Sequence, residues 1–182
     1  MKTNSLFAAV LGKTPVLSCA AVLCAVAFAA QAADDRVKID NDQARVLVVS
    51  SAPGAKSALH DHKMNRVMIY LDAGKMTLTD TAGKVETLNF KAGEVLWSPA
   101  VGPHVSLNVS DHPVRIVEVE LKSKPGRPNT AKPAALDPVK VDPKRSQVEM
   151  KNDQVRVIRA RYKPHEKGVM HEHTLNRVVK WS

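Results

Sequence analysis

Three histidines carry the clearest chemical pattern in this sequence. His60 and His62 are one residue apart directly after a β-rich run, and His104 follows further along the chain. Residues i and i+2 of a strand share one face, so the first two imidazoles can point at one place and His104 can join them from another strand. Three neutral imidazoles leave coordination positions open, as in catalytic metal sites. The pattern predicts a metal site at His60, His62 and His104; the alternative is a set of ordinary surface histidines.

The surrounding segment is repeated. Residues 41–67 return 111 positions later, as 152–178, with no gap and with 12 of 27 residues identical. The repeat predicts one folding unit used twice. Its second copy contains His171 and His173 but no equivalent of His104. Two histidines alone make a poor metal site, so we expect the second copy to be a degenerate half-barrel that is kept for packing.

Strand patterns dominate the rest of the chain, and no long amphipathic helix is visible. Runs rich in β-branched and large apolar residues are separated by turn-forming Gly and Pro sequences, which predicts an all-β antiparallel sandwich or barrel. The first group of runs covers 44–50, 66–71, 85–90 and 114–121. A Pro-rich stretch then predicts an extended linker over 123–144. Further strands are expected at 147–150, 155–162 and 177–181.

The order of glycines, histidines and other motif residues is similar to a known family pattern. The first copy reads Gly54-x5-His60-x-His62-x4-Val67-x6-Gly74, then Gly93-x5-Pro99-x4-His104-x3-Asn108. These stretches resemble the two motifs of the cupin superfamily over roughly residues 36–122, and the repeat extends the resemblance to 145–182. The resemblance implies a small antiparallel, jelly-roll-like β-barrel followed by a partial second cupin repeat, that is, a bicupin with a truncated second unit. In metal-binding cupins, three histidines and a glutamate hold one metal ion.

The sequence departs from that pattern at the glutamate. Val67 stands at the glutamate position, and Val178 stands there in the second copy. A divalent ion on three neutral histidines would give a site of charge +2, which disfavours Mg and Mn and favours Zn, Fe, Ni or Cu. Such a site would also invite an anionic ligand.

These residues leave two functions open. We expect a protein that binds or acts on a small, anionic molecule at a three-histidine metal site, with an oxygenase-like reaction as one form of it. The alternative is a non-enzymatic small-ligand-binding or structural cupin module without metal. Whether the protein is an enzyme is left open.

Two further residues are candidates for substrate binding, Arg66 and Asn108. Arg66 belongs to an Asn-Arg pair that both copies share, and its forked guanidinium could hold a carboxylate or phosphate at the barrel mouth. The alternative is a surface ion pair, because Arg66 would point outward if Val67 faced the barrel interior. Asn108 is the last residue of the second motif.

Residues 1–32 read as a signal peptide. Positive charge at Lys2 precedes an Ala-rich apolar run, and Ala30-Gln31-Ala32 is a small-x-small cleavage site. We therefore predict a secreted or periplasmic protein without stable membrane insertion after cleavage; an uncleaved membrane anchor is the alternative. Both cysteines, Cys19 and Cys24, lie in this segment. The processed chain would thus have neither disulfides nor thiolate ligands.

The charge and the repeat bear on partners. The net charge is +9, but the basic residues are scattered and aromatic residues make up only 4% of the chain, so nucleic acid is not an expected partner. We expect a cupin barrel at 36–122 and a partial second unit at 145–182. That second unit has few strands and its apolar faces need a partner. It could complete the first barrel or pair with another chain, and we expect a homodimer or a swapped assembly.

Overall fold

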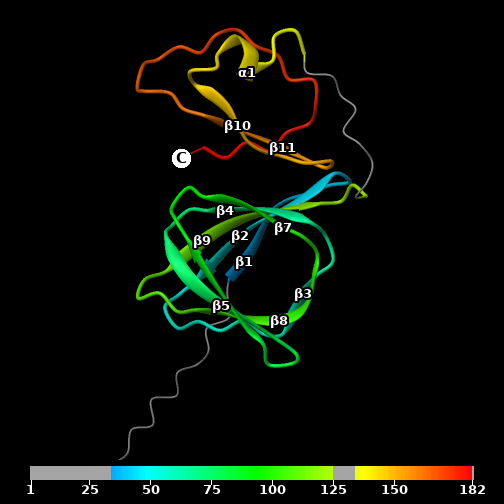
Figure 1. Cartoon of the computed structure of the whole chain (residues 1–182), viewed down its shortest axis with the longest axis vertical. Helices are drawn as coiled ribbons and strands as arrows, with labels where there is room; N and C mark the ends of the chain where they lie inside the picture. Colours follow the sequence, from blue (N-terminus) through cyan, green and yellow to red (C-terminus); the bar gives the residue numbers. More distant parts are fainter. Residues whose placement is uncertain (1–33, 125–133, 182) are drawn as a thin grey trace, which may run out of the picture.

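The computed structural model describes residues 34–124 and 134–181. The predicted signal peptide and the middle of the predicted linker lie outside these ranges. Figure 1 shows a barrel formed by the first range and a smaller C-terminal segment formed by the second. None of the helices in the described ranges is long and apolar enough to cross a membrane.

The barrel consists of two antiparallel sheets, which confirms the predicted all-β fold class. The five-stranded sheet has the order β1-β2-β9-β4-β7 and the four-stranded sheet the order β3-β8-β5-β6. The strands of the first sheet are β1 (Asp34–Asp40), β2 (Ala44–Ser51), β4 (Arg66–Tyr70), β7 (Val95–Ser98) and β9 (Val114–Leu121). Those of the second are β3 (His60–His62), β5 (Gly74–Asp80), β6 (Val85–Phe90) and β8 (Val101–Asn108).

Two motif glycines occupy backbone conformations that other residues rarely adopt. Gly54 has φ 70° in the turn after β2, and Gly93 has φ 78° in the turn before β7. A side chain strains the backbone in this left-handed region, so glycine suits both positions. The two turns lead into the segments that carry the motif histidines.

One half of the barrel interior is apolar. Alternate residues of β4 and β9, such as Met68, Tyr70 and Ile116, pack with Met76 and Phe90 from the other sheet. The rings of Tyr70 and Phe90 stack with centroids 4.0 Å apart. This cluster holds the two sheets together and shows which side chains of β4 and β9 face inward.

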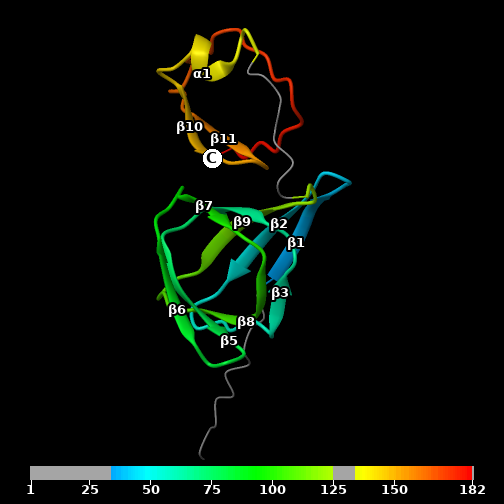
Figure 2. The same ribbon diagram turned by 45° about the vertical axis from the view of Figure 1, so that its right-hand side comes forward.

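The outer face of the five-stranded sheet is also apolar. It is formed by buried residues that alternate with the inward-facing ones: Ala44, Val46, Val67, Val117 and Val119. A C-terminal hairpin covers this face (Figure 2) and contributes Met150, Val155 and Val157 to the same cluster. Polar contacts fix the hairpin in place: Asn65 donates to Gln154 at 2.5 Å, and Arg159 donates to the carbonyl of Gly93 at 2.5 Å. The sheet is therefore buried on both sides.

The covering hairpin, β10 (Ser146–Lys151) and β11 (Arg156–Ala160), has the same local features as β1–β2. A bulge lies between Val148 and Met150 in β10, and another between Val37 and Ile39 in β1. Asn41 and Asn152 each accept two backbone N–H groups in the following turn. Each of these pairs is separated by 111 residues.

The C-terminal segment differs from two expectations. The short helix α1 (Pro138–Val141) lies inside the predicted extended linker, since Asp137 accepts the N–H of Val139 and Pro138 occupies the first turn, where it needs no donor. The strand expected at 177–181 is wrong, because these residues form no strand. The matching segment of the barrel, β4, is paired on both sides by β7 and β9.

Candidate metal centre

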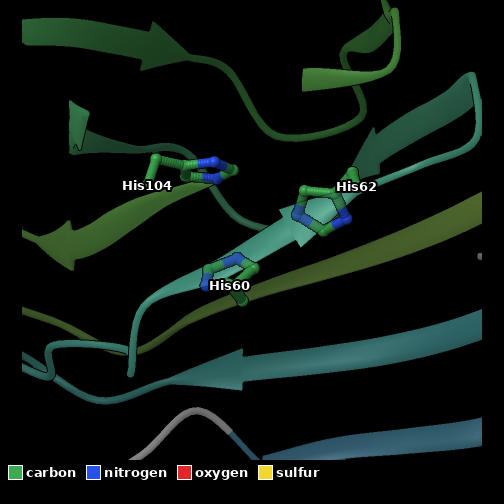
Figure 3. Close-up of side chains that lie close together, drawn as sticks. All are labelled: His60, His62 and His104. Atoms are coloured by element: carbon green, nitrogen blue, oxygen red, sulfur yellow. The ribbon is translucent and has the colours of Figure 1, made fainter. Parts of the chain in front are cut away.

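The fold brings the three predicted histidines together. His60 on β3 lies directly opposite His104 on β8 in the strand register, and His62 is two residues further along β3. The ring centroids of His60 and His104 are 4.6 Å apart. The ring centroid of His62 lies 5.0 Å from that of His60 and 5.4 Å from that of His104. Figure 3 shows the three side chains converging from the two strands. One ring nitrogen from each lies within 4.8 Å of the others, so a single ion can contact all three.

Backbone carbonyls determine the tautomers of two of these rings. The Nδ1 of His60 lies 2.9 Å from the carbonyl oxygen of Ala58, and the Nδ1 of His104 lies 2.9 Å from that of Gly102. A carbonyl oxygen only accepts hydrogen bonds, so each Nδ1 carries the proton. The Nε2 of each neutral ring then keeps its lone pair, as a metal ligand requires.

His62 is held neutral by its surroundings. Burial lowers its pKa to about 3, and the positive charge of Arg66 and the neighbouring rings of His60 and His104 act in the same direction. A metal-binding histidine must be deprotonated, so a low pKa removes competition between protons and metal. The ring of His62 is thus a neutral nitrogen donor at neutral pH.

Two buried carboxylates lie next to the histidines, and the sequence reasoning missed both. Glu118 and Glu120 of β9 alternate with the outward-facing Val119 and so share the inward face with Ile116. Glu120 Oε1 is 3.8 Å from Nδ1 of His62, and the two glutamates and His62 form a second group of potential ligand atoms. The i, i+2 spacing of the glutamates is visible in the sequence, but the alternation of the strand does not tell which of its two faces is the inner one.

Arg66 is placed differently from either expectation. It lies on the same face of β4 as Met68, so it points into the barrel, while Val67 packs in the outer cluster. The expectation that Val67 faces inward and Arg66 outward is therefore wrong. Arg66 is only 5% exposed, and its guanidinium donates to Glu118 at 2.8 Å and to Ser98 at 3.2 Å. Arg66 therefore forms neither a surface ion pair nor an unoccupied ligand-binding group at the mouth of the barrel.

Asn108 has a structural role. Its side chain is fully buried, and its amide nitrogen donates to backbone carbonyls at Ser51, Ala52 and His112 at 2.9 to 3.1 Å. Its amide oxygen accepts the N–H of Ser110 at 2.9 Å. The polar groups of Asn108 are thus committed to joining loops, which does not fit the substrate contact predicted for it.

Comparison with known proteins agrees with this architecture. The family model described as "Cupin domain" matches residues 47–120. These residues are a cupin domain. Among curated proteins, no match is found.

Solved structures similar to this chain include a cupin domain from Bordetella pertussis, 28% identical, with a TM-score of 0.48 over 50% of this chain and 95% of that one. An oxalate decarboxylase from Lactobacillus farciminis, in complex with formate, is 26% identical with a TM-score of 0.41, covering 50% of this chain and 29% of that one. A polyketide cyclase from Streptomyces resistomycificus is 21% identical with a TM-score of 0.39, covering 51% and 69%.

Outside the cupin domain, the second histidine pair repeats the local geometry of the first. The rings of His171 and His173 lie 4.9 Å apart at 88°, against 5.0 Å and 88° for His60 and His62. The Nδ1 of His171 also contacts a carbonyl two residues back, that of Val169, at 2.8 Å. Both side chains are exposed, and within the described ranges no third histidine or acidic group joins them in a set of three. The cupin domain therefore offers the better metal site.

Proposed function

We propose that this protein is a metal-dependent cupin in which His60, His62 and His104 bind one divalent transition metal ion, Zn, Fe, Ni or Cu, and present it to a small molecule. The observation that carries the proposal is the convergence of three imidazole rings, two of which have their Nδ1 atoms facing backbone carbonyls. A metal held by three imidazoles keeps positions open for a ligand and can act as a Lewis acid there.

The charges around the histidines favour an anionic ligand. Glu118 is balanced by Arg66 at 2.8 Å, and Glu120 by Arg45 at 3.5 Å. With both carboxylates balanced and the histidines neutral, the charge of a divalent ion would remain uncompensated. A small carboxylate or similar anion would reduce that charge by binding the ion directly.

Metal content tests the proposal. We expect the full chain, purified without chelator, to contain about one equivalent of metal by elemental analysis, in keeping with one three-histidine set. His62→Ala should lose this metal. His173→Ala is the matched control, since it changes the same position of the second histidine pair and should keep it. A folded wild-type protein that does not take up Zn, Fe, Ni or Cu would instead support the metal-free ligand-binding alternative.

We further propose that residues 145–182 are a partial second cupin unit and that the protein forms a homodimer. The bulges and asparagine turns shared by the two hairpins support the first point. Exposed apolar side chains support the second, among them Met170 at 82% and Trp181 at 84% exposure. Size-exclusion chromatography with light scattering should give the mass of a dimer, and a strictly monomeric protein would contradict the assembly.

The sequence pattern of residues 1–32 supports export to the periplasm or the medium. The mature protein should then begin close to Ala33. N-terminal sequencing of protein recovered from the periplasmic fraction checks this, and an intact Met1 in protein recovered from the membrane fraction would favour the uncleaved anchor.

A further inference from the structure

We infer that Glu120 is a positioning residue for the metal centre: it accepts the Nδ1 proton of His62 and so presents the Nε2 of that ring to the ion. The inference rests on the proposed metal function. It gives a carboxylate of β9 a supporting role beside the histidines, whereas the glutamate of the sequence motif, at the position of Val67, would bind the ion itself.

The three histidines differ in what faces their Nδ1 atoms. His60 and His104 each contact the carbonyl of the residue two positions earlier, at 2.9 Å. The Nδ1 of His62 faces a carboxylate instead, with Oε1 of Glu120 at 3.8 Å. A histidine that binds metal through one nitrogen commonly donates its other N–H to a carbonyl or carboxylate, which fixes the tautomer and the ring orientation. At 3.8 Å this contact is longer than a hydrogen bond, and Glu120 is the carboxylate placed to complete that arrangement for the third ring once the ion is bound.

Glu120 is held in a position suited to this role. It is 6% exposed, on a central strand of the five-stranded sheet. Its two oxygens face different groups: Oε2 lies 3.5 Å from the guanidinium of Arg45, its register partner on β2, while Oε1 faces His62. The arginine orients the carboxylate from one side and leaves one oxygen for the imidazole.

The neighbouring carboxylate is less suited to the same role. Glu118 is engaged by Arg66 through a charged hydrogen bond of 2.8 Å. Glu120 contacts its arginine through Oε2 at 3.5 Å, so its Oε1 stays available to the imidazole of His62. Binding of a metal at Nε2 makes the Nδ1 proton more acidic and strengthens its hydrogen bond, which should shorten the 3.8 Å separation.

Two variants of the full chain test the inference by metal affinity. Competition with a chromogenic chelator would measure Zn²⁺ affinity, and the visible absorption of the Co²⁺-loaded protein would report the ligand geometry. Glu120→Ala should weaken Zn²⁺ binding by about 10- to 100-fold, the usual effect of losing such a partner, and should change the Co²⁺ spectrum. Glu120→Gln keeps an oxygen that can accept the proton and should fall between Glu120→Ala and wild type.

Glu86→Gln is the charge-matched control. It removes one negative charge from an exposed position of β6 and should bind both ions like wild type. Circular dichroism and a thermal melt would show that each variant is folded. Wild-type affinity and an unchanged Co²⁺ spectrum in a folded Glu120→Ala protein would overturn the inference while leaving the three-histidine site standing.

A measurement without metal separates this inference from the proposed function. Long-range ¹H–¹⁵N spectra of metal-free protein report the tautomer of each histidine. His62 should carry its proton on Nδ1 in wild type and shift toward the other tautomer in Glu120→Ala, while His60 and His104 stay unchanged. Failure of wild type to bind metal would sink the proposed function, and an unchanged His62 tautomer in Glu120→Ala would sink the role of Glu120.

Discussion

Arg66 and Glu118 form a buried ion pair inside the barrel, with Nη1 and Oε2 2.8 Å apart and side-chain exposures of 6% and 10%. The pair joins β4 to β9 at the level where the apolar interior gives way to the histidines. A second hydrogen bond, from Arg66 to Ser98, ties β7 to the same group. Three strands of the five-stranded sheet are thus connected through one guanidinium next to the candidate metal centre.

Removing one partner of this pair should destabilise the barrel strongly. Arg66→Met leaves Glu118 as a buried charge without its 2.8 Å partner. Breaking a buried ion pair in this way typically costs about 3–5 kcal/mol. Urea denaturation of the metal-free variant should show that loss in the free energy of unfolding.

The double variant Arg66→Met with Glu118→Met provides the control. Replacing both charges by apolar groups of similar size is often neutral or stabilising, so much of the lost free energy should return. If Arg66→Met alone were as stable as wild type, the pair would not hold the strands as described.

Introducing a carboxylate at the motif position should not build a better metal site. Val67 is 4% exposed and packs in the outer cluster with Val119, beneath the C-terminal hairpin. Val67→Glu would bury an unpaired carboxylate on the face away from the histidines, so it should lower the free energy of unfolding by several kcal/mol. Zn²⁺ affinity of the folded fraction, measured at low temperature, should stay at the wild-type value.

Val85→Glu is the matched control for this change. Val85 lies on β6 and is 57% exposed, so the same substitution there should alter stability by less than about 0.5 kcal/mol. A rise in Zn²⁺ affinity in Val67→Glu would show that residue 67 reaches the histidines, and hence that it faces the barrel interior and not the outer cluster.

Local sequence patterns were sufficient to predict much of the barrel. The predicted strand at 85–90 is β6, and those at 44–50 and 114–121 correspond to β2 and β9. The prediction that His60, His62 and His104 converge combined a local rule with the motif order. Residues i and i+2 share a face of a strand, and the order of the two cupin motifs places His104 on another strand.

The orientation of β4 and β9 was not predictable in the same way. Both strands alternate, and the usual assumption puts the more apolar face inward. Here the apolar set that includes Val67 and Val119 faces outward because the C-terminal hairpin covers it. Arg66 and Glu120 thereby lie inside the barrel. Only the long-range contact between the hairpin and the sheet decides which face is internal, and local periodicity carries no information about that contact.

Metal should stabilise the folded chain. A ligand that binds only the folded state raises the free energy of unfolding by RT ln(1 + [L]/Kd), which is about 2.7 kcal/mol at one hundred times Kd. Adding Zn²⁺ to chelator-treated protein should therefore raise the melting temperature of wild type. His104→Ala should show a much smaller rise, since His104 supplies one of the three nitrogens.

The control for this measurement is His112→Ala. His112 lies in the exposed turn between β8 and β9, and its ring contacts Asp111 and the carbonyl of Ala73. Its variant should keep the full rise with Zn²⁺. Equal rises in His104→Ala and wild type would mean that the stabilising ion binds elsewhere.

The stability of the metal-free protein should fall as the pH drops from about 6.5 towards 3. His62 has a pKa lowered to about 3 in the folded chain, chiefly by burial, against 6.5 as its ordinary value. Between these pH values the unfolded chain binds a proton at His62 and the folded chain does not. Acid therefore favours unfolding, and the free energy of unfolding rises with pH across this window. His62→Asn cannot take up that proton, and its stability should depend less steeply on pH over the same range.

His112 gives the opposite sign and serves as the comparison. Its hydrogen bond to the carbonyl of Ala73, and then its contact with Asp111, raise the pKa of His112 above the ordinary value. The protonated ring is therefore favoured in the folded state, and its contribution is present below pH 6.5 and disappears as the pH rises through the raised pKa. In urea denaturation from pH 4 to 8, His62→Asn should reduce the loss of unfolding free energy at acid pH. His112→Asn should not reduce it. Parallel curves for wild type and His62→Asn would show that His62 is accessible to protons in the folded protein, contrary to its buried position beside Arg66.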